Sequence, residues 1–188
     1  MSLLGEIVKQ NNIFVEKLPE SYLHRNDDVS KYPEKELAIY TCMDTRLVEF
    51  LEPAMGIKRG QAKIIKAAGN MVTGPFDEVI RSLMVAVYEL GVREIAVVGH
   101  EDCGMAHSTS QSLKAKMLER GISPDAIKFV EKEFTSWVDA FSHPHDNVKN
   151  AVEAIRNNPL LPDDVPIHGL IFCPKTGKIE IIVDGYKK

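Results

Sequence analysis

The chain has 188 residues, of which 44% are hydrophobic, and a formal net charge of −4 from 23 Lys and Arg against 27 Asp and Glu. This length allows one domain with a sizeable core. The scattered basic residues argue against nucleic-acid or membrane-surface partners, and no apolar stretch approaches the roughly 18 residues that span a bilayer. The N-terminus does not resemble a signal peptide, so we expect a cytoplasmic protein. Its three cysteines are then expected to bind a metal or to be buried rather than to form disulfides.

Helical spacing of apolar residues predicts an N-terminal helix and several later ones, and short apolar runs predict strands. The segment 19–36 between the first helix and the first strand is predicted to be irregular. In chain order, the helices are expected at 3–17, briefly near 47–51, and at 76–90, 110–120, 124–140 and 144–157. The strands are expected at 37–41, 62–67, 94–99, 167–172 and 178–183.

Strands that alternate with helices indicate an α/β fold with a mostly parallel sheet. The turn Pro174-Lys175-Thr176-Gly177 joins the last two strands, which predicts an antiparallel hairpin at the edge of the sheet. The helix over 76–90 is expected to start near Thr73-Gly74-Pro75 and to stop at Gly91. We therefore predict a single α/β domain covered by helices.

Cysteine and histidine residues lie at the ends of two predicted strands. Cys42 ends the first strand, and His100 ends the third, with Cys103 three positions later. In such sheets ligands bind beyond the carboxyl ends of the strands. Two thiolates and one imidazole are a typical ligand set for a catalytic zinc with an open fourth position. Cys173 in the late hairpin remains an alternative fourth ligand.

Asp44 and Arg46 follow Cys42 at alternate positions, so in an extended segment their side chains would share its side. Arg46 can hold Asp44 ionised through a bidentate contact. An ionised Asp44 could accept a hydrogen bond from a zinc-bound water or hydroxide. If Arg46 moved away, Asp44 could instead become a fourth zinc ligand in a closed resting state. The sequence thus contains the parts of a switch.

Each of these signals has an ordinary explanation when taken alone. A buried cysteine at a strand end is more often part of the core, and an Asp-x-Arg pair is usually a surface ion pair worth under about 1 kcal/mol. The joint occurrence of both motifs at two strand ends favours the metal site.

The motifs resemble those of the β-class carbonic anhydrases, in particular their compact prokaryotic branch. That family carries a Cys-x-Asp-Ser/Thr-Arg motif, an Ala-Gly-Asn segment and a His-x-x-Cys-Gly motif. The resemblance covers about residues 35 to 185. Here the motifs are Cys42-Met43-Asp44-Thr45-Arg46, Ala68-Gly69-Asn70 and His100-Glu101-Asp102-Cys103-Gly104.

The resemblance implies a carbonate dehydratase, a lyase that interconverts carbon dioxide and bicarbonate with one zinc per subunit. It implies a homodimer or higher homo-oligomer, in which residues 1–34 form an N-terminal helix and arm that pack on a partner subunit. Residues 35–188 would form the zinc-binding catalytic α/β domain. The roles carried over are zinc binding for Cys42, His100 and Cys103, the catalytic dyad for Asp44 and Arg46, and substrate binding for Gly69 and Gly104.

The expected mechanism is attack of a zinc-bound hydroxide on carbon dioxide in a small apolar pocket. His107, one helical turn past Cys103, is a candidate proton shuttle, although a surface or packing role is more usual for such a histidine. Two alternatives remain at this point. The first is a hydrolase of carbonyl sulfide or carbon disulfide on the same scaffold. The second is a non-catalytic zinc-binding protein, whose coordination sphere would be completed by a fourth protein ligand.

Overall fold

The computed structural model describes residues 2–19, 22 and 30–187. Part of the segment predicted to be irregular, residues 20–21 and 23–29, lies outside the described residues. The chain forms two compact units, Met1–Lys31 and Tyr32–Lys188. The fold and the candidate site belong to the second unit.

The first unit contains helix α1, Leu3–Glu16, as the apolar spacing predicted. Ser2 caps its N-terminus by accepting a hydrogen bond from the Gly5 backbone amide at 3.2 Å. None of the α1 residues is buried, although the helix carries many apolar side chains. Its exposed large apolar residues are Leu3, Leu4, Ile7, Val8, Ile13, Phe14 and Val15.

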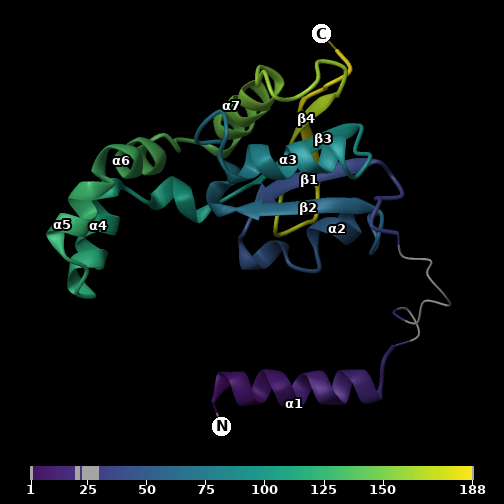
Figure 1. The fold of residues 1–188 in the computed structure, drawn as a ribbon, viewed down its shortest axis with the longest axis horizontal. Coiled ribbons are helices and arrows are strands. Elements are labelled where there is room, and N and C mark those ends of the chain that lie inside the picture. Colours follow the sequence, from purple (N-terminus) through teal and green to yellow (C-terminus); the bar gives the residue numbers. More distant parts are fainter. Residues whose placement is uncertain (1, 20–21, 23–29, 188) are drawn as a thin grey trace. The chain divides into compact units, whose positions relative to one another are not determined.

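The second unit is built on a five-stranded sheet in the order β2-β1-β3-β4-β5 (Figure 1). The first four strands are parallel neighbours, and β4 and β5 pair antiparallel. This confirms the predicted fold class, including the edge hairpin. The strands are β1 Leu37–Cys42, β2 Ala62–Ala67, β3 Glu94–His100, β4 Ile167–Phe172 and β5 Ile179–Val183.

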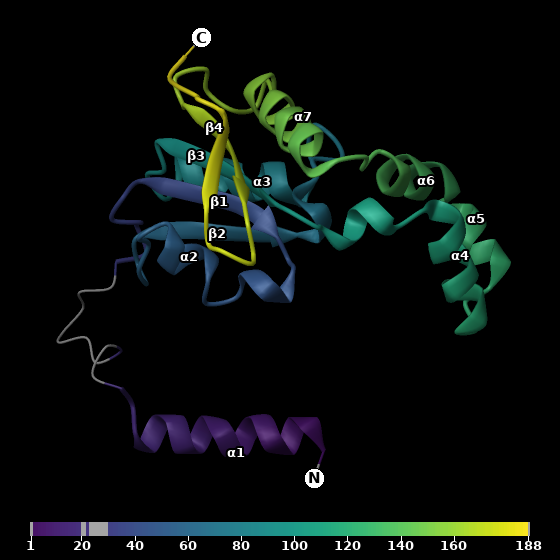
Figure 2. The ribbon, with the colours of Figure 1, turned by 180° about the vertical axis from the view of Figure 1, so that it is seen from behind.

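Helices cover both faces of this sheet (Figures 1 and 2). In β1, Ala38 and Tyr40 contribute to the core beneath α3 and α7. Ile39 points to the opposite face, where a second core includes Leu47 and Leu51. The helices are α2 Leu51–Ala54, α3 Glu78–Tyr88, α4 Ser110–Glu119, α5 Pro124–Phe129, α6 Glu131–Asp139 and α7 Pro144–Arg156, with short 3-10 helices η2 Thr45–Leu47, η3 Ala68–Asn70 and η4 Gly104–His107.

Two helix boundaries differ from the sequence prediction. The start predicted near Thr73-Gly74-Pro75 was wrong, because Asp77 is the N-cap of α3 and accepts a hydrogen bond from the Ile80 amide at 2.9 Å. Such a cap contributes about 1 kcal/mol. The single helix predicted over 124–140 was also wrong. Val130 leaves the helical region with φ −111° and ψ 11°, which separates α5 from α6.

Helix α7 approaches the sheet closely because two strand residues are glycines. A Cβ on Gly99 of β3 would lie 2.6 Å from Val148 Cγ2, and one on Gly169 of β4 would lie 2.8 Å from Val148 Cγ1. Both distances are too short for real side chains, so α7 could not pack here against alanine without moving. The close packing of α7 therefore holds β3 and β4 in place.

None of the helices in the part of the chain that the structure describes is long and apolar enough to cross a membrane.

The carboxyl ends of β1 and β3 lie side by side at one edge of the sheet, because the two strands pair in parallel with Thr41 opposite Val98. Strand β1 is flanked by β2 on one side and by β3 on the other, so the strand order reverses at β1. Ligands of open α/β sheets bind at such switch points.

Candidate metal centre

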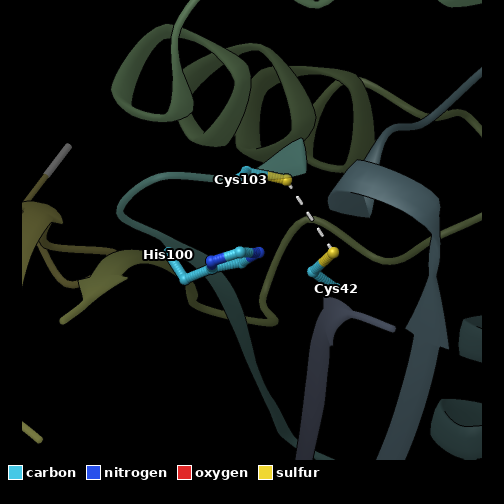
Figure 3. Close-up of side chains that lie close together, drawn as sticks. All are labelled: Cys42, His100 and Cys103. Carbon is cyan, nitrogen blue, oxygen red and sulfur yellow. Dashed lines mark hydrogen bonds between the residues drawn. The ribbon is translucent and has the colours of Figure 1, made fainter. Parts of the chain in front are cut away.

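Three potential metal ligands converge at this switch point. Cys42 is the last residue of β1, His100 the last of β3, and Cys103 follows in the next turn. One ligand atom from each lies within 4.8 Å of the other two, and all three residues are buried. Figure 3 shows the imidazole and the two thiols grouped together. The three side chains thus lie close together at the two strand ends, as the sequence predicted.

The orientation of His100 suits it to bind a metal. Its Nδ1 lies 2.9 Å from the Glu101 backbone carbonyl oxygen, so Nδ1 carries the proton and donates it. The other ring nitrogen, Nε2, then has a free lone pair. That atom is buried and has no hydrogen-bond partner. A buried nitrogen without a partner is costly, and a metal ion between the three residues would remove that cost.

The two thiols form a coupled pair, with Cys42 Sγ and Cys103 Sγ 3.9 Å apart. The hydrogen bond from Cys103 lowers the pKa of Cys42, and the nearby His100 ring and the Gly69 and Asp44 backbones act in the same direction. The same Cys42–Cys103 bond, together with burial, raises the pKa of Cys103. One thiolate is therefore available in the protein alone, and a cation would favour the second.

The charge on Cys42 also acts on His100. Burial by itself would lower the pKa of His100, but the interaction with the Cys42 thiolate and the other nearby negative charge outweigh burial, so the net shift is upward. The raised pKa favours a second proton on the His100 ring. A metal ion would displace this proton, since a ligating imidazole must be neutral.

The residues fit a zinc ion. Two sulfurs and one imidazole nitrogen are a soft donor set that favours zinc over magnesium or manganese. Among the described residues, the group of potential ligands contains Cys42, His100 and Cys103 and does not include Cys173. Cys173 directly follows β4 at the same edge of the sheet, closer in space than its distance in sequence suggested.

Asp44 and Arg46 meet as predicted, but not through an extended backbone. Strand β1 ends at Cys42, and Asp44 is the N-cap of the 3-10 helix η2, accepting the Arg46 amide at 2.9 Å. The expectation of an extended segment was therefore wrong. The turn brings Arg46 back onto Asp44, so Nε lies 3.0 Å from Oδ1 and Nη2 lies 2.9 Å from Oδ2.

This bidentate contact controls the charge of Asp44. The hydrogen bonds from the Arg46 side chain lower the pKa of Asp44 to about 2, so the carboxylate is ionised at neutral pH. Its Oδ2 atom lies 3.8 Å from His100 Nε2. An ionised carboxylate thus stands directly beside the three potential ligands.

Sequence reasoning missed a second partner of Arg46. Arg46 Nη1 donates to Asp102 Oδ2 at 3.0 Å, and Nη2 donates to the Asp102 backbone carbonyl at 2.7 Å. The two residues are 56 positions apart, and no local pattern signals the contact. His107, the candidate proton shuttle, has Nε2 3.7 Å from Asp102 Oδ1 and a side chain that is 75% exposed.

The two glycines named from the sequence occupy different surroundings. Gly69 is buried with φ +66°, and a Cβ there would lie 3.0 Å from Met105 and 3.1 Å from Phe141. Its backbone hydrogen-bonds Cys42, which makes it a support for a potential ligand. Gly104 begins η4, and an added Cβ there would meet no atom within 4 Å. Their roles in substrate binding remain predictions.

A groove of about 810 Å³ opens near this edge of the sheet, but the three potential ligands and the Asp44–Arg46 pair do not line it. Its walls include Ala67, Met71, Phe134 and Trp137. Carbon dioxide is far smaller than this space, and the groove carries no titratable group of the metal centre. We therefore do not assign it to the substrate.

Comparison with known proteins places the chain in a family. Residues 37–179 match the family model described as "Carbonic anhydrase". The fold and the Cys-His-Cys site are those of the β class, and the chain belongs to the β-carbonic anhydrase family, a family of carbonate dehydratases. The prediction of a compact β-class enzyme is confirmed at this level.

Individual relatives are similar over three quarters of the chain or more. "Putative carbonic anhydrase YtiB" of Bacillus subtilis (strain 168) is 45% identical over 190 residues, covering 99% of both chains. The crystal structure of β-carbonic anhydrase isoform I of Trichomonas vaginalis is 48% identical, with a TM-score of 0.93 over 99% of this chain and 100% of that one. A "Carbon disulfide hydrolase" of Acidianus sp. (strain A1-3) is 31% identical over 160 residues, covering 77% of this chain and 76% of that protein.

Proposed function

We propose that this protein catalyses the reversible hydration of carbon dioxide to bicarbonate and a proton at a zinc ion held by Cys42, His100 and Cys103. The observation that carries the proposal is the convergence of these three buried residues within 4.8 Å, beside an Asp44 carboxylate that Arg46 keeps ionised. Membership of the β-carbonic anhydrase family supports it.

When bound, zinc would lower the pKa of a water molecule toward about 7 and so supply a hydroxide nucleophile near neutral pH. The protein residues have separate tasks. The Cys42 and Cys103 sulfurs and the free His100 Nε2 would hold the ion. The Glu101 carbonyl fixes the ring of His100 through Nδ1, which orients the imidazole and increases its basicity.

Asp44 would act as a hydrogen-bond acceptor for the attacking nucleophile. Its Oδ2 lies on the side of the metal centre, 3.8 Å from His100 Nε2. Because Arg46 lowers the pKa of Asp44 to about 2, the carboxylate accepts rather than donates over the whole neutral range. In this structure both Asp44 oxygens bond to Arg46. In the alternative closed resting state, Asp44 itself would be a zinc ligand and would take the position of the nucleophile.

We further propose that residues 1–34 pack on a partner subunit in a homodimer or higher homo-oligomer, while residues 35–188 form the catalytic domain. Helix α1 carries seven exposed large apolar residues and buries none. A helix whose apolar face has no cover within its own unit is stabilised by a partner. Light scattering on the full chain should give at least twice the 21.0 kDa mass of one chain, and the α1 double variant Leu4→Glu, Ile7→Glu should lower it.

Hydrolysis of carbon disulfide or carbonyl sulfide is the second candidate function, because a relative named carbon disulfide hydrolase matches 77% of the chain. The same ligands would serve that reaction. The two functions separate in a direct comparison, in which the zinc-loaded protein is assayed for carbon dioxide hydration at mildly alkaline pH and for sulfide release from carbon disulfide. Hydration without sulfide release supports the first function, and the reverse result supports the second.

A non-catalytic zinc protein is the third alternative. It requires a fourth protein ligand, and Cys173 is outside the ligand group in the described part of the chain. X-ray absorption at the zinc edge at pH 6.5 and 8.5 tests this alternative. Two sulfurs at both pH values fit the proposal, whereas three sulfurs at both would support a closed structural site and refute it.

A further inference from the structure

Asp102 lies between two proposed zinc ligands, His100 and Cys103, in an unusual backbone conformation. Its φ is +53°, the left-handed region that non-glycine residues rarely occupy. Aspartate and asparagine tolerate this region better than other residues do. The turn is followed immediately by Cys103, so the conformation of Asp102 helps to determine where that thiol lies. The conformation also determines the direction of the Asp102 carbonyl.

Two oxygens of Asp102 are bonded to Arg46. The backbone carbonyl accepts from Nη2 at 2.7 Å, and carboxylate Oδ2 accepts from Nη1 at 3.0 Å. On its other edge the same guanidinium donates from Nε and Nη2 to Asp44. Four of its five N–H groups are therefore held by two aspartates. Asp44 follows β1 and Asp102 follows β3, so Arg46 links the two strand ends.

Arg46 needs a second anchor because it is not held by burial. Its side chain is 41% exposed, compared with 17% for Asp44 and 65% for Asp102. An exposed arginine with one carboxylate partner exchanges easily with water and contributes little fixed geometry. Contacts from two sides restrict rotation about the guanidinium and fix the plane in which it meets Asp44.

We propose that Asp102 is a positioning residue that holds Arg46 against Asp44 and thereby keeps the Asp44 carboxylate directed for the reaction. This inference rests on the proposed function, and it adds a residue that acts through Arg46 rather than on the substrate. Two parts of Asp102 contribute. The carboxylate anchors Nη1, and the left-handed backbone presents the carbonyl to Nη2.

Two variants of Asp102 test the carboxylate anchor, and a third variant is a control. Asp102→Gly keeps the left-handed backbone and its carbonyl but removes the carboxylate. Asp102→Asn keeps the backbone preference and an oxygen acceptor for Nη1 without the charge. Glu49→Gly is the matched control, since Glu49 is another exposed acidic residue with positive φ, +55°, in the segment after β1, and the hydrogen bonds and ion pairs of Arg46 are with Asp44 and Asp102.

The first measurement is the crystal structure of each zinc-loaded variant, which reports on Arg46 independently of activity. We expect the Arg46 guanidinium to lose one or both of its Asp44 bonds in Asp102→Gly and to keep them in Glu49→Gly. The second is steady-state kinetics of carbon dioxide hydration. A small misplacement of a catalytic group reduces the rate strongly, so kcat should fall about 10-fold or more in Asp102→Gly with KM changed less than about twofold. Asp102→Asn should restore part of this loss.

An Asp102→Gly structure with both Asp44–Arg46 bonds intact would overturn the inference, and so would a kcat equal to that of Glu49→Gly. An Asp102→Asn variant no better than Asp102→Gly would also overturn it, because the anchoring oxygen would then be irrelevant. A wild-type protein that holds zinc but does not hydrate carbon dioxide refutes the proposed function instead. In that case the Arg46 position in the variant crystals still tests the positioning role.

Discussion

The Asp44–Arg46 pair predicts a pH-dependent loss of stability when the arginine charge is removed. Hydrogen bonds from Arg46 lower the pKa of Asp44 from its ordinary value of 3.8 to about 2. The difference between these values corresponds to about 2.5 kcal/mol. Because the Arg46 side chain is 41% exposed, solvent screens part of this interaction. We therefore expect Arg46→Gln to lower the free energy of unfolding by about 1–1.5 kcal/mol at pH 7.

The sign of the pH dependence follows from the direction of the shift. A carboxyl group with a depressed pKa in the folded state stabilises that state above its unfolded pKa, and this contribution disappears as the pH falls through the folded value. The difference between wild type and Arg46→Gln should thus be constant above about pH 4 and shrink toward about pH 2.

Urea unfolding of the reduced, metal-free proteins at several pH values measures this difference directly. Arg93→Gln is the control, because Arg93 pairs with Glu36 at 3.5 Å through side chains that are 80% and 56% exposed. That change should cost less than about 0.5 kcal/mol at any pH. Equal losses in the two variants, or a loss in Arg46→Gln that does not change between pH 4 and pH 2, would show that Arg46 does not stabilise the ionised form of Asp44.

Two further predictions concern glycines. Gly99→Ala should lower the free energy of unfolding by about 1–3 kcal/mol in urea titrations, because its Cβ would lie 2.6 Å from Val148 Cγ2. The control is Gly74→Ala, whose Cβ would meet no atom within 4 Å. Its free energy of unfolding should differ from that of the wild type by under about 0.5 kcal/mol. Gly69→Ala should weaken zinc binding, measured in competition with a chromophoric chelator. A side chain at Gly69 is disfavoured by the backbone φ of +66° and by the short distance to Met105, and the strain would act beside Cys42. The control Gly104→Ala should bind zinc as the wild type does. Wild-type affinity in Gly69→Ala would contradict the strain argument.

Much of the fold could be predicted because its signals are local. The buried strands that carry Cys42 and His100 are continuous apolar runs, and their parallel arrangement follows from the helices between them. Once both strand ends are placed at one edge of the sheet, the metal centre follows. The break at Val130 was not predictable in this way, because neither glycine nor proline marks it.

The contacts around Arg46 show where sequence reasoning stops. The sequence predicts the Asp44–Arg46 pair, but the 3-10 turn that forms it depends on Asp44 acting as a cap. The Asp102 contact spans 56 residues and depends on a left-handed aspartate. Neither spacing nor composition indicates this contact, because it depends on two strand ends that are distant in sequence and meet only in the folded chain.

We propose above that a zinc ion held by Cys42, His100 and Cys103 is what makes this protein active as a carbonate dehydratase. The most direct test is a zinc titration of the metal-free protein, with the initial rate of carbon dioxide hydration followed by stopped flow at each point. We expect the rate to rise in proportion to added zinc and to reach a plateau at one equivalent per chain. Full zinc occupancy without hydration above the buffer rate, or hydration that does not depend on zinc, would contradict it.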